Sequence, residues 1–91
     1  MSGFWEVGKK VFIRGVTNYY IGEIAGFDRD DKEIILKKAS WIADTGRFAD
    51  AMKSGNLGEV EPYPDDRAVL INREAIMDAC EWPFDLPDKQ K

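Results

Sequence analysis

The groups in this sequence that could do chemistry are mainly carboxylates, together with two adjacent tyrosines and a single thiol. Asp30-Asp31 and Asp65-Asp66 are paired acids, but both pairs lie in charged, loop-like stretches where nothing raises one pKa above the other. The sequence has no histidine, and Cys80 has no evident base, so one chain cannot assemble a nucleophilic triad. We therefore expect a protein that is not an enzyme and has no catalytic residues.

Metal binding is not predicted either. The stretch DRDDKE at residues 28–33 offers carboxylate oxygens, but it lacks the central glycine and the final bidentate glutamate of a calcium loop. Without histidine, Cys80 cannot take part in a common zinc spacing. We expect no cofactor, and we interpret Cys80 as a small buried residue.

Two aromatic side chains are better placed for binding. Tyr19 and Tyr20 follow Thr17 and Asn18 at a break between two apolar runs, where an exposed ring can stack on a base or a ribose. Because neighbouring strand residues point to opposite faces, one tyrosine should point inward and the other outward. Tyr19 is therefore a candidate ligand-binding residue.

Composition limits what can position these residues. The chain has 91 residues, of which 44% are apolar and 12% aromatic, and this suits a single domain over residues 1–91. Its net charge of -4 argues against broad capture of phosphate backbones. The start MSGFWEVGKK has no long apolar core, and no stretch approaches the length of a membrane span. We expect a cytoplasmic protein with no membrane partner.

Three strands are predicted in the first half of the sequence. Residues 9–16 alternate apolar and polar side chains, as in a half-buried strand, and residues 19–27 and 33–43 continue with β-branched and aromatic residues. Gly22 and Gly26 interrupt the second strand. Because glycine weakens a flat ladder, we expect a sharp bend there and a curved, barrel-like sheet.

An insertion of helix plus loop is predicted over residues 44–67. Asp44 or Thr45 is the expected helix N-cap, and Gly55 is the expected stop. Residues 59–67 carry two prolines and four acids and are interpreted as an exposed connector.

Two short strands with a tight corner are predicted within residues 68–82, and residues 83–91 are expected to form a flexible tail. The whole pattern is mainly β. It predicts a small, strongly bent, five-stranded barrel with a short helix inserted between strands three and four.

The residues themselves resemble the Sm-like family, and within it the small Sm-like proteins of phage origin. The first stretch with this likeness contains Gly22, Ile24, Phe27-Asp28 and Ile34-Ile35-Leu36. The second is INREAI at residues 71–76, where the family usually has Ile-Arg-Gly-x-x-Ile. The resemblance implies an Sm-like (SH3-like) barrel that joins other copies edge to edge, as a homo-oligomeric ring of about five to seven subunits.

The resemblance also implies a ligand site. Family members of the RNA-binding kind hold a base between an aromatic or aliphatic residue and an arginine, with a nearby asparagine. Carried over to this sequence, the candidate ligand-binding residues are Asp28, Asn72 and Arg73, with Arg29 in the same turn as Asp28. The alternative is that Asp28 caps the turn and pairs with Arg73, and that Arg29 is a solvated turn residue.

Two functions follow from this interpretation. The first is a non-enzymatic, ring-forming binding protein for a nucleotide-type ligand, either short RNA or a small signalling nucleotide, acting in the host cytoplasm if the protein is phage-encoded. The second is a structural or protein-interaction ring with no nucleotide ligand. The low positive charge favours a small ligand or a protein partner over long RNA.

Overall fold

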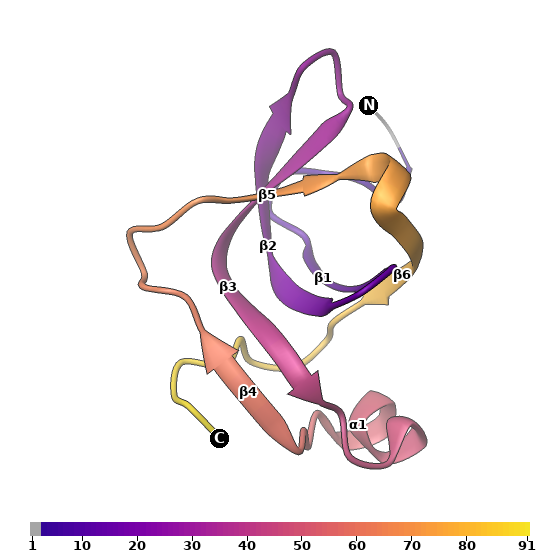
Figure 1. The fold of residues 1–91 in the computed structure, drawn as a ribbon, viewed down its shortest axis with the longest axis vertical. Helices are drawn as coiled ribbons and strands as arrows, with labels where there is room; N and C mark the ends of the chain where they lie inside the picture. Colours follow the sequence, from indigo (N-terminus) through magenta and orange to yellow (C-terminus); the bar gives the residue numbers. More distant parts are fainter. Residues whose placement is uncertain (1–2) are drawn as a thin grey trace.

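The chain, described here over residues 3–91 by a computed structural model, is a mainly β fold with six strands in one antiparallel sheet and one short helix. In chain order the elements are β1 Lys10–Gly15, β2 Tyr19–Asp28, β3 Glu33–Asp44, α1 Phe48–Ser54, β4 Glu59–Pro62, β5 Val69–Asn72, the 3-10 turn η1 Arg73–Ala75 and β6 Ile76–Glu81 (Figure 1). The sheet order is β4-β3-β2-β1-β6, and β5 pairs with β3. In the described part of the chain, no helix is long and apolar enough to cross a bilayer.

The bend of the sheet lies in β2 and β3. The start of β3 pairs with β5 and its end pairs with β4, so the two halves of one strand have different outer neighbours. The β2–β3 register shifts at two places, between Ile21 and Glu23 and again between Ile24 and Gly26. The first shift leaves Gly22 close to Leu36, where an added Cβ would lie 3.2 Å from the leucine Cβ. The bulges therefore fall at the glycines that were predicted to bend the strand.

A first core cluster fills the inside of the bent sheet. It is built by residues that alternate along β1, β2, β3 and β5, as expected for strands with one face turned inward. Its buried members are Val11, Ile13, Ile24, Ile34, Leu36, Ala39, Val69 and Ile71. This cluster supports the two sheet ends where loops meet.

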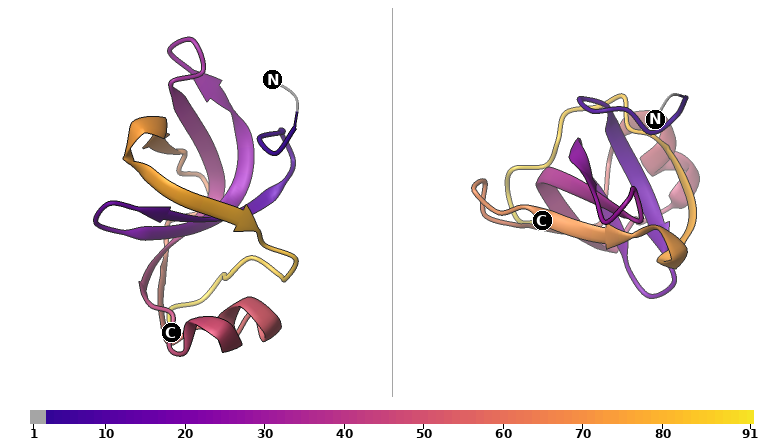
Figure 2. Two further views of the ribbon diagram at one scale, coloured as in Figure 1. Left: turned by 90° about the vertical axis from the view of Figure 1, so that its right-hand side faces the viewer. Right: turned by 90° about the horizontal axis from the view of Figure 1, so that it is seen from above.

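A second core cluster lies on the opposite face of the sheet, and the sequence pattern did not predict it. Its buried members are Phe12, Ile21, Ile42, Ala51, Leu57, Val60 and Trp82. Phe12 is 1% exposed, so β1 is buried on both faces rather than half-buried. The reason is that α1 and the residues after β6 cover the face that would otherwise meet solvent (Figure 2).

Two local predictions need correction. Glu59–Pro62 is a strand, β4, which pairs with the end of β3, so the sheet has six strands where five were predicted. The α1 N-cap is Arg47, without a side-chain cap hydrogen bond, rather than Asp44 or Thr45. Gly55 does end the helix, in the left-handed conformation with φ of 77°.

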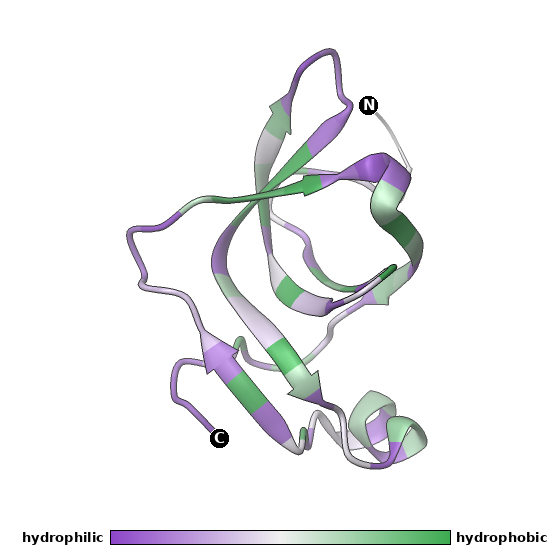
Figure 3. Ribbon diagram, in the orientation of Figure 1, coloured by the Kyte–Doolittle hydropathy of each residue, from purple (hydrophilic) through white to green (hydrophobic). Residues whose placement is uncertain are grey.

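The segment after β6 runs past α1 to the outer side of β4 (Figures 1 and 2). Its end forms a two-way backbone bridge, in which the N–H groups of Lys91 and Val60 each donate to the other residue's carbonyl at 2.9 Å. Phe84 and Leu86 pack on the second cluster, while the outer residues of the segment are hydrophilic (Figure 3). That residues 83–91 are flexible stays a prediction.

Candidate functional site

The turn between β2 and β3 has an unusual backbone. Arg29, Asp30 and Asp31 have φ angles of 52°, 57° and 65°, a run of left-handed residues with no glycine among them. The carboxylate of Asp28 accepts a hydrogen bond from the Arg29 N–H at 2.8 Å, and the Lys32 N–H donates to the Arg29 carbonyl at 3.1 Å. Asp28 therefore caps this turn, as the first half of the alternative interpretation predicted, whereas its pairing with Arg73 stays a prediction.

The corner between β5 and β6 lies beside that turn. Asn72 pairs with Glu33 in the sheet, and Glu33 pairs with Asp28 on its other side, so three adjacent strand ends carry these residues in one row. The Asn72 side-chain oxygen accepts a hydrogen bond from the Glu74 N–H at 2.9 Å and caps η1. Asn72 and Asp28 thus each stabilise the loop that they begin.

Arg73 fastens the two loops together. Its backbone N–H donates to the Lys32 carbonyl at 3.0 Å, and its side-chain Nε donates to the Asp31 carbonyl. Its guanidinium carbon lies 5.7 Å from the ring centroid of Trp5 and 5.6 Å from that of Phe27. Both distances are within the range of cation–π attraction, so the two rings help to orient the guanidinium.

Together the two loops line a cleft of about 380 Å³, which we call the loop site. Its lining residues are Arg29, Asp31, Lys32, Glu33, Asn72, Arg73 and Glu74. Arg29 is mainly exposed, with a guanidinium nitrogen 3.9 Å from a Glu33 carboxylate oxygen. The structure therefore brings Arg29, Asn72 and Arg73 together in one cleft, with Asp28 at its edge.

Trp5 and Phe27 are parts of this arrangement that sequence reasoning did not select as site residues. Phe27 carried a signal, because it is the aromatic residue directly before Asp28 in the quoted motif. Trp5 carried none, since its segment precedes the first strand and reaches the loop site through tertiary packing alone.

Tyr19 lies elsewhere, at the opposite end of β2 from Asp28. It belongs to the margin of the second cluster, with its ring centroid 5.9 Å from that of Phe12, whereas Tyr20 packs on the first cluster. The two tyrosines therefore point to opposite faces of the sheet, as predicted, but both are half-buried against a core cluster, so neither points outward to solvent as one was expected to.

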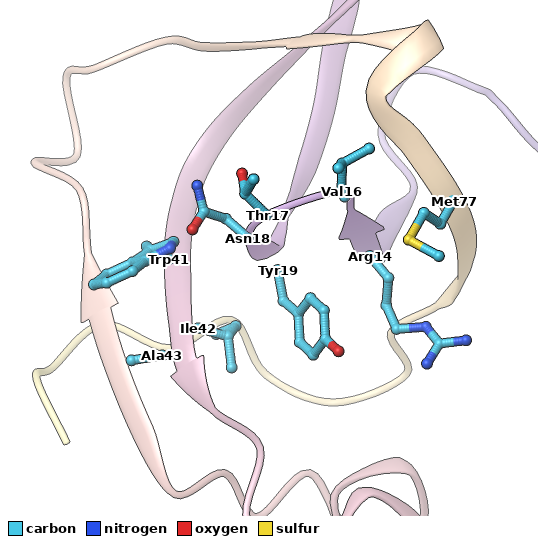
Figure 4. Close-up of a pocket in the computed structure, with 10 residues that line it drawn as sticks. Arg14, Val16, Thr17, Asn18, Tyr19, Trp41, Ile42, Ala43 and Met77 are labelled. Atoms are coloured by element: carbon cyan, nitrogen blue, oxygen red, sulfur yellow. The ribbon is translucent and has the colours of Figure 1, made fainter.

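Tyr19 lines a second cleft of about 420 Å³, which we call the outer groove (Figure 4). The groove lies between the β1–β2 turn, the end of β3 and the start of β6. Its lining residues are Arg14, Gly15, Val16, Thr17, Asn18, Tyr19, Trp41, Ile42, Ala43 and Met77. Val16, Trp41 and Met77 are exposed apolar side chains on its walls, whereas Ile42 is buried.

Charge is compensated at one end of the outer groove. Arg14 forms a bidentate ion pair with Asp78, with 2.6 Å between Arg14 Nε and Asp78 Oδ1, and its guanidinium lies 5.2 Å from the Phe48 ring centroid. The hydrogen bonds from Arg14 lower the pKa of the Asp78 carboxyl below its ordinary value.

Cys80 is exposed, which corrects the prediction of a buried residue. It lies on β6 on the same side as α1, with its sulfur 3.8 Å from the Met52 sulfur. Partial burial of the thiol is the main cause that raises its pKa, and the negative charge of Asp78 adds to it. A raised pKa leaves less of the reactive thiolate at neutral pH.

Comparison with models of known protein families gave no match, and comparison with curated proteins gave none either. The Sm-like resemblance therefore depends on the quoted residues of this sequence alone.

Proposed function

We propose that this protein is a non-enzymatic Sm-like barrel protein that assembles as a homo-oligomeric ring and binds a nucleotide-type ligand at the loop site. The observation that carries the ligand proposal is the position of Arg73. The two motifs that contain Asp28 and Asn72-Arg73 are far apart in sequence, yet their loops are joined by Arg73, whose guanidinium is oriented by Trp5 and Phe27. An oriented guanidinium offers both a stacking plane and charge-assisted donors to a nucleotide.

Ring assembly is supported by two of the three edge strands of the described sheet, β5 and β6, since the third, β4, is paired on its outer side with Lys91. In the part of the chain that the structure describes, β5 has β3 as its one strand neighbour and β6 has β1. Each of these edge strands carries an exposed apolar residue: Leu70 on β5 is 54% exposed, and Met77 on β6 is 72% exposed. Open edges with apolar side chains favour pairing with another chain, and head-to-tail pairing of β5 with β6 of the next copy can close a ring.

Light scattering of purified protein tests the assembly. The expected mass corresponds to about five to seven copies, and Met77→Lys should shift it toward the monomer by placing a charge on the edge. Val7→Lys is the matched control, because Val7 is also exposed but lies outside the edge strands. A monomeric wild type at micromolar concentration contradicts the ring.

Calorimetric titration with short oligoribonucleotides and with linear and cyclic mononucleotides tests the ligand. We expect binding below millimolar concentration that weakens by ~1–3 kcal/mol in Arg73→Ala, the scale of a lost charged hydrogen bond. Because Arg73 also fastens the loops, Lys32→Ala serves as a second variant that removes an exposed cation from the cleft. The nucleotide proposal fails if none of these probes binds.

A structural or protein-interaction ring is the second candidate, and the charge of the loop site favours it. The turn and corner contain five carboxylates, Asp28, Asp30, Asp31, Glu33 and Glu74, and three cations, Arg29, Lys32 and Arg73. This excess of negative charge repels phosphates. If the ring forms and no nucleotide binds, a protein partner becomes the better account.

A further inference from the structure

The outer groove has the composition of a small-molecule site and does not share a lining residue with the loop site. Its volume of about 420 Å³ lies in the ordinary range of ligand pockets, and its walls combine aromatic and aliphatic side chains with a few polar groups. Trp41 is 38% exposed and Met77 is 72% exposed, so both present apolar surface that the protein itself leaves uncovered. Figure 4 shows Trp41 on one side of the groove and Met77 on the other.

The charge of the groove restricts the ligand. Arg14 is the one charged residue among the ten that line it, in a chain where 33% of residues are charged. Its guanidinium is already bonded to both carboxylate oxygens of Asp78. A phosphate or carboxylate would therefore compete with Asp78 for that cation, whereas an uncharged ligand meets no such competition.

The polar groups of the groove lie on the β1–β2 turn. Thr17 offers a hydroxyl and Asn18 an amide, both drawn on the turn in Figure 4. The Asn18 amide nitrogen donates to the Tyr20 hydroxyl at 3.4 Å, and an amide has a second N–H and an oxygen with which to meet a ligand. The turn itself is fixed, because the Gly15 N–H donates to the Asn18 carbonyl at 2.8 Å and the Val16 N–H donates to the Ala75 carbonyl at 3.0 Å. An amide that both donates and accepts is suited to the edge of a ring with nitrogen and oxygen atoms.

We propose that the outer groove binds an uncharged heteroaromatic ring of the nucleobase type, stacked on Trp41 with Asn18 hydrogen-bonded to its edge. This site is independent of the loop site, but it shares Met77 with the β6 edge at which the proposed ring would close. Tyr19 therefore lines the outer groove and not the loop site, where the other candidate residues lie.

Ligand-observed nuclear magnetic resonance and calorimetry test the proposal with three probes: adenosine, adenosine monophosphate and indole. Adenosine should bind, and the monophosphate should bind no more tightly than adenosine. Trp41→Ala should weaken adenosine binding by about 5- to 150-fold, the range found for a lost base–aromatic stack. Trp41→Phe, which keeps an aromatic face, is the matched control and should retain most of the affinity.

Asn18→Ala distinguishes stacking from hydrogen bonding at the edge of the ring. It should weaken the binding of adenosine more than the binding of indole, because indole lacks the edge groups that the Asn18 amide would bond. Thermal melting of each variant verifies that the fold is kept. The proposal is overturned if adenosine does not bind, if indole binds and adenosine does not, or if adenosine affinity is unchanged in Trp41→Ala. The monophosphate and adenosine are also compared in the Arg73→Ala variant, which weakens nucleotide binding at the loop site. The proposal is equally overturned if the monophosphate binds this variant at least about tenfold more tightly than adenosine does, because that identifies a phosphate site in the outer groove.

Discussion

Arg14 of β1 and Asp78 of β6 are direct partners in the strand register, and their side chains form a bidentate ion pair on the surface. The register shifts immediately after this pair, between Arg14 and Gly15. The ion pair therefore marks the last regular position before the chain turns toward the outer groove, and it links the first strand of the sheet to the last.

Replacing Asp78 with Asn should lower stability at neutral pH and have little effect in acid. Arg14 holds the pKa of Asp78 below its ordinary value of 3.8 in the folded protein. The stabilisation from this carboxylate is therefore fully present above the unfolded pKa and is lost as pH falls through the folded pKa. Urea unfolding of wild type and Asp78→Asn over a pH series should show two stabilities that converge below pH 3.8. A difference that stays constant with pH contradicts this account.

Gly22→Ala should destabilise the fold while Gly26→Ala should be tolerated. A Cβ on Gly22 would lie 3.2 Å from side-chain atoms of Leu36 and 3.3 Å from the Ala39 Cα, whereas a Cβ on Gly26 meets its nearest neighbour, Ile35, at 4.0 Å. Overpacking of a buried position costs ~1–3 kcal/mol. Urea unfolding gives the free energy of unfolding of each variant, and equal losses in the two would mean that the bulge at Gly22 can relax.

Asp30→Gly should stabilise the protein by about 0.5–1 kcal/mol. A residue with a side chain costs ~1–2 kcal/mol in the left-handed conformation, and glycine relieves this strain. Part of the gain is offset because glycine loses more backbone entropy than aspartate on folding. Asp30 has φ of 57° between two other left-handed residues. Lys32→Gly is the control in the same turn, because Lys32 is not among the residues with positive φ and should lose stability. Thermal melting compares the two, and a loss of stability in Asp30→Gly refutes the prediction.

Gly55→Ala should loosen the segment after β6. A Cβ on Gly55 would lie 2.7 Å from the Phe84 ring, and the residue also has φ of 77°. Gly46 has φ of 71° but its nearest neighbour would be 3.7 Å away, so Gly46→Ala has the backbone strain without the clash. Hydrogen exchange at the Lys91 amide, which donates to the Val60 carbonyl, should rise in Gly55→Ala more than in Gly46→Ala. Equal exchange in both variants would show that Phe84 moves aside without cost.

The strands that build the first cluster could be predicted from sequence, because Val11 and Ile13 are two residues apart and so share one face of a strand. β4 could not, since Glu59, Glu61 and Pro62 read as a connector and its pairing comes from the end of β3. The second face of β1 was missed because Phe12 becomes buried by α1 and by residues after β6, which no local pattern reveals.

The loop site was anticipated in part. Asp28, Asn72 and Arg73 lie near one another because β2 ends, β3 begins and β5 ends in the same row of the sheet. The two motifs predicted that proximity. Tyr19 was assigned to the same ligand, but β2 separates it from Asp28 by the length of a 10-residue strand, up to about 30 Å when extended. Trp5 reaches Arg73 from a segment with no regular pattern, so only the folded chain reveals it.

The pairing of β1 with β6 has a consequence for folding during synthesis. Val11 pairs with Glu81, so β1 gains its second neighbour only after β6 has also left the ribosome. Until then β1, β2 and β3 can form a meander with an open edge at β1, and Phe12 lacks Trp82, its stacked neighbour in the second cluster. Contacts this distant in sequence form slowly, and an open apolar edge invites pairing with other nascent chains. Slow translation of the stretch that encodes β6 should therefore lower the yield of folded protein more than slow translation of the stretch that encodes β1.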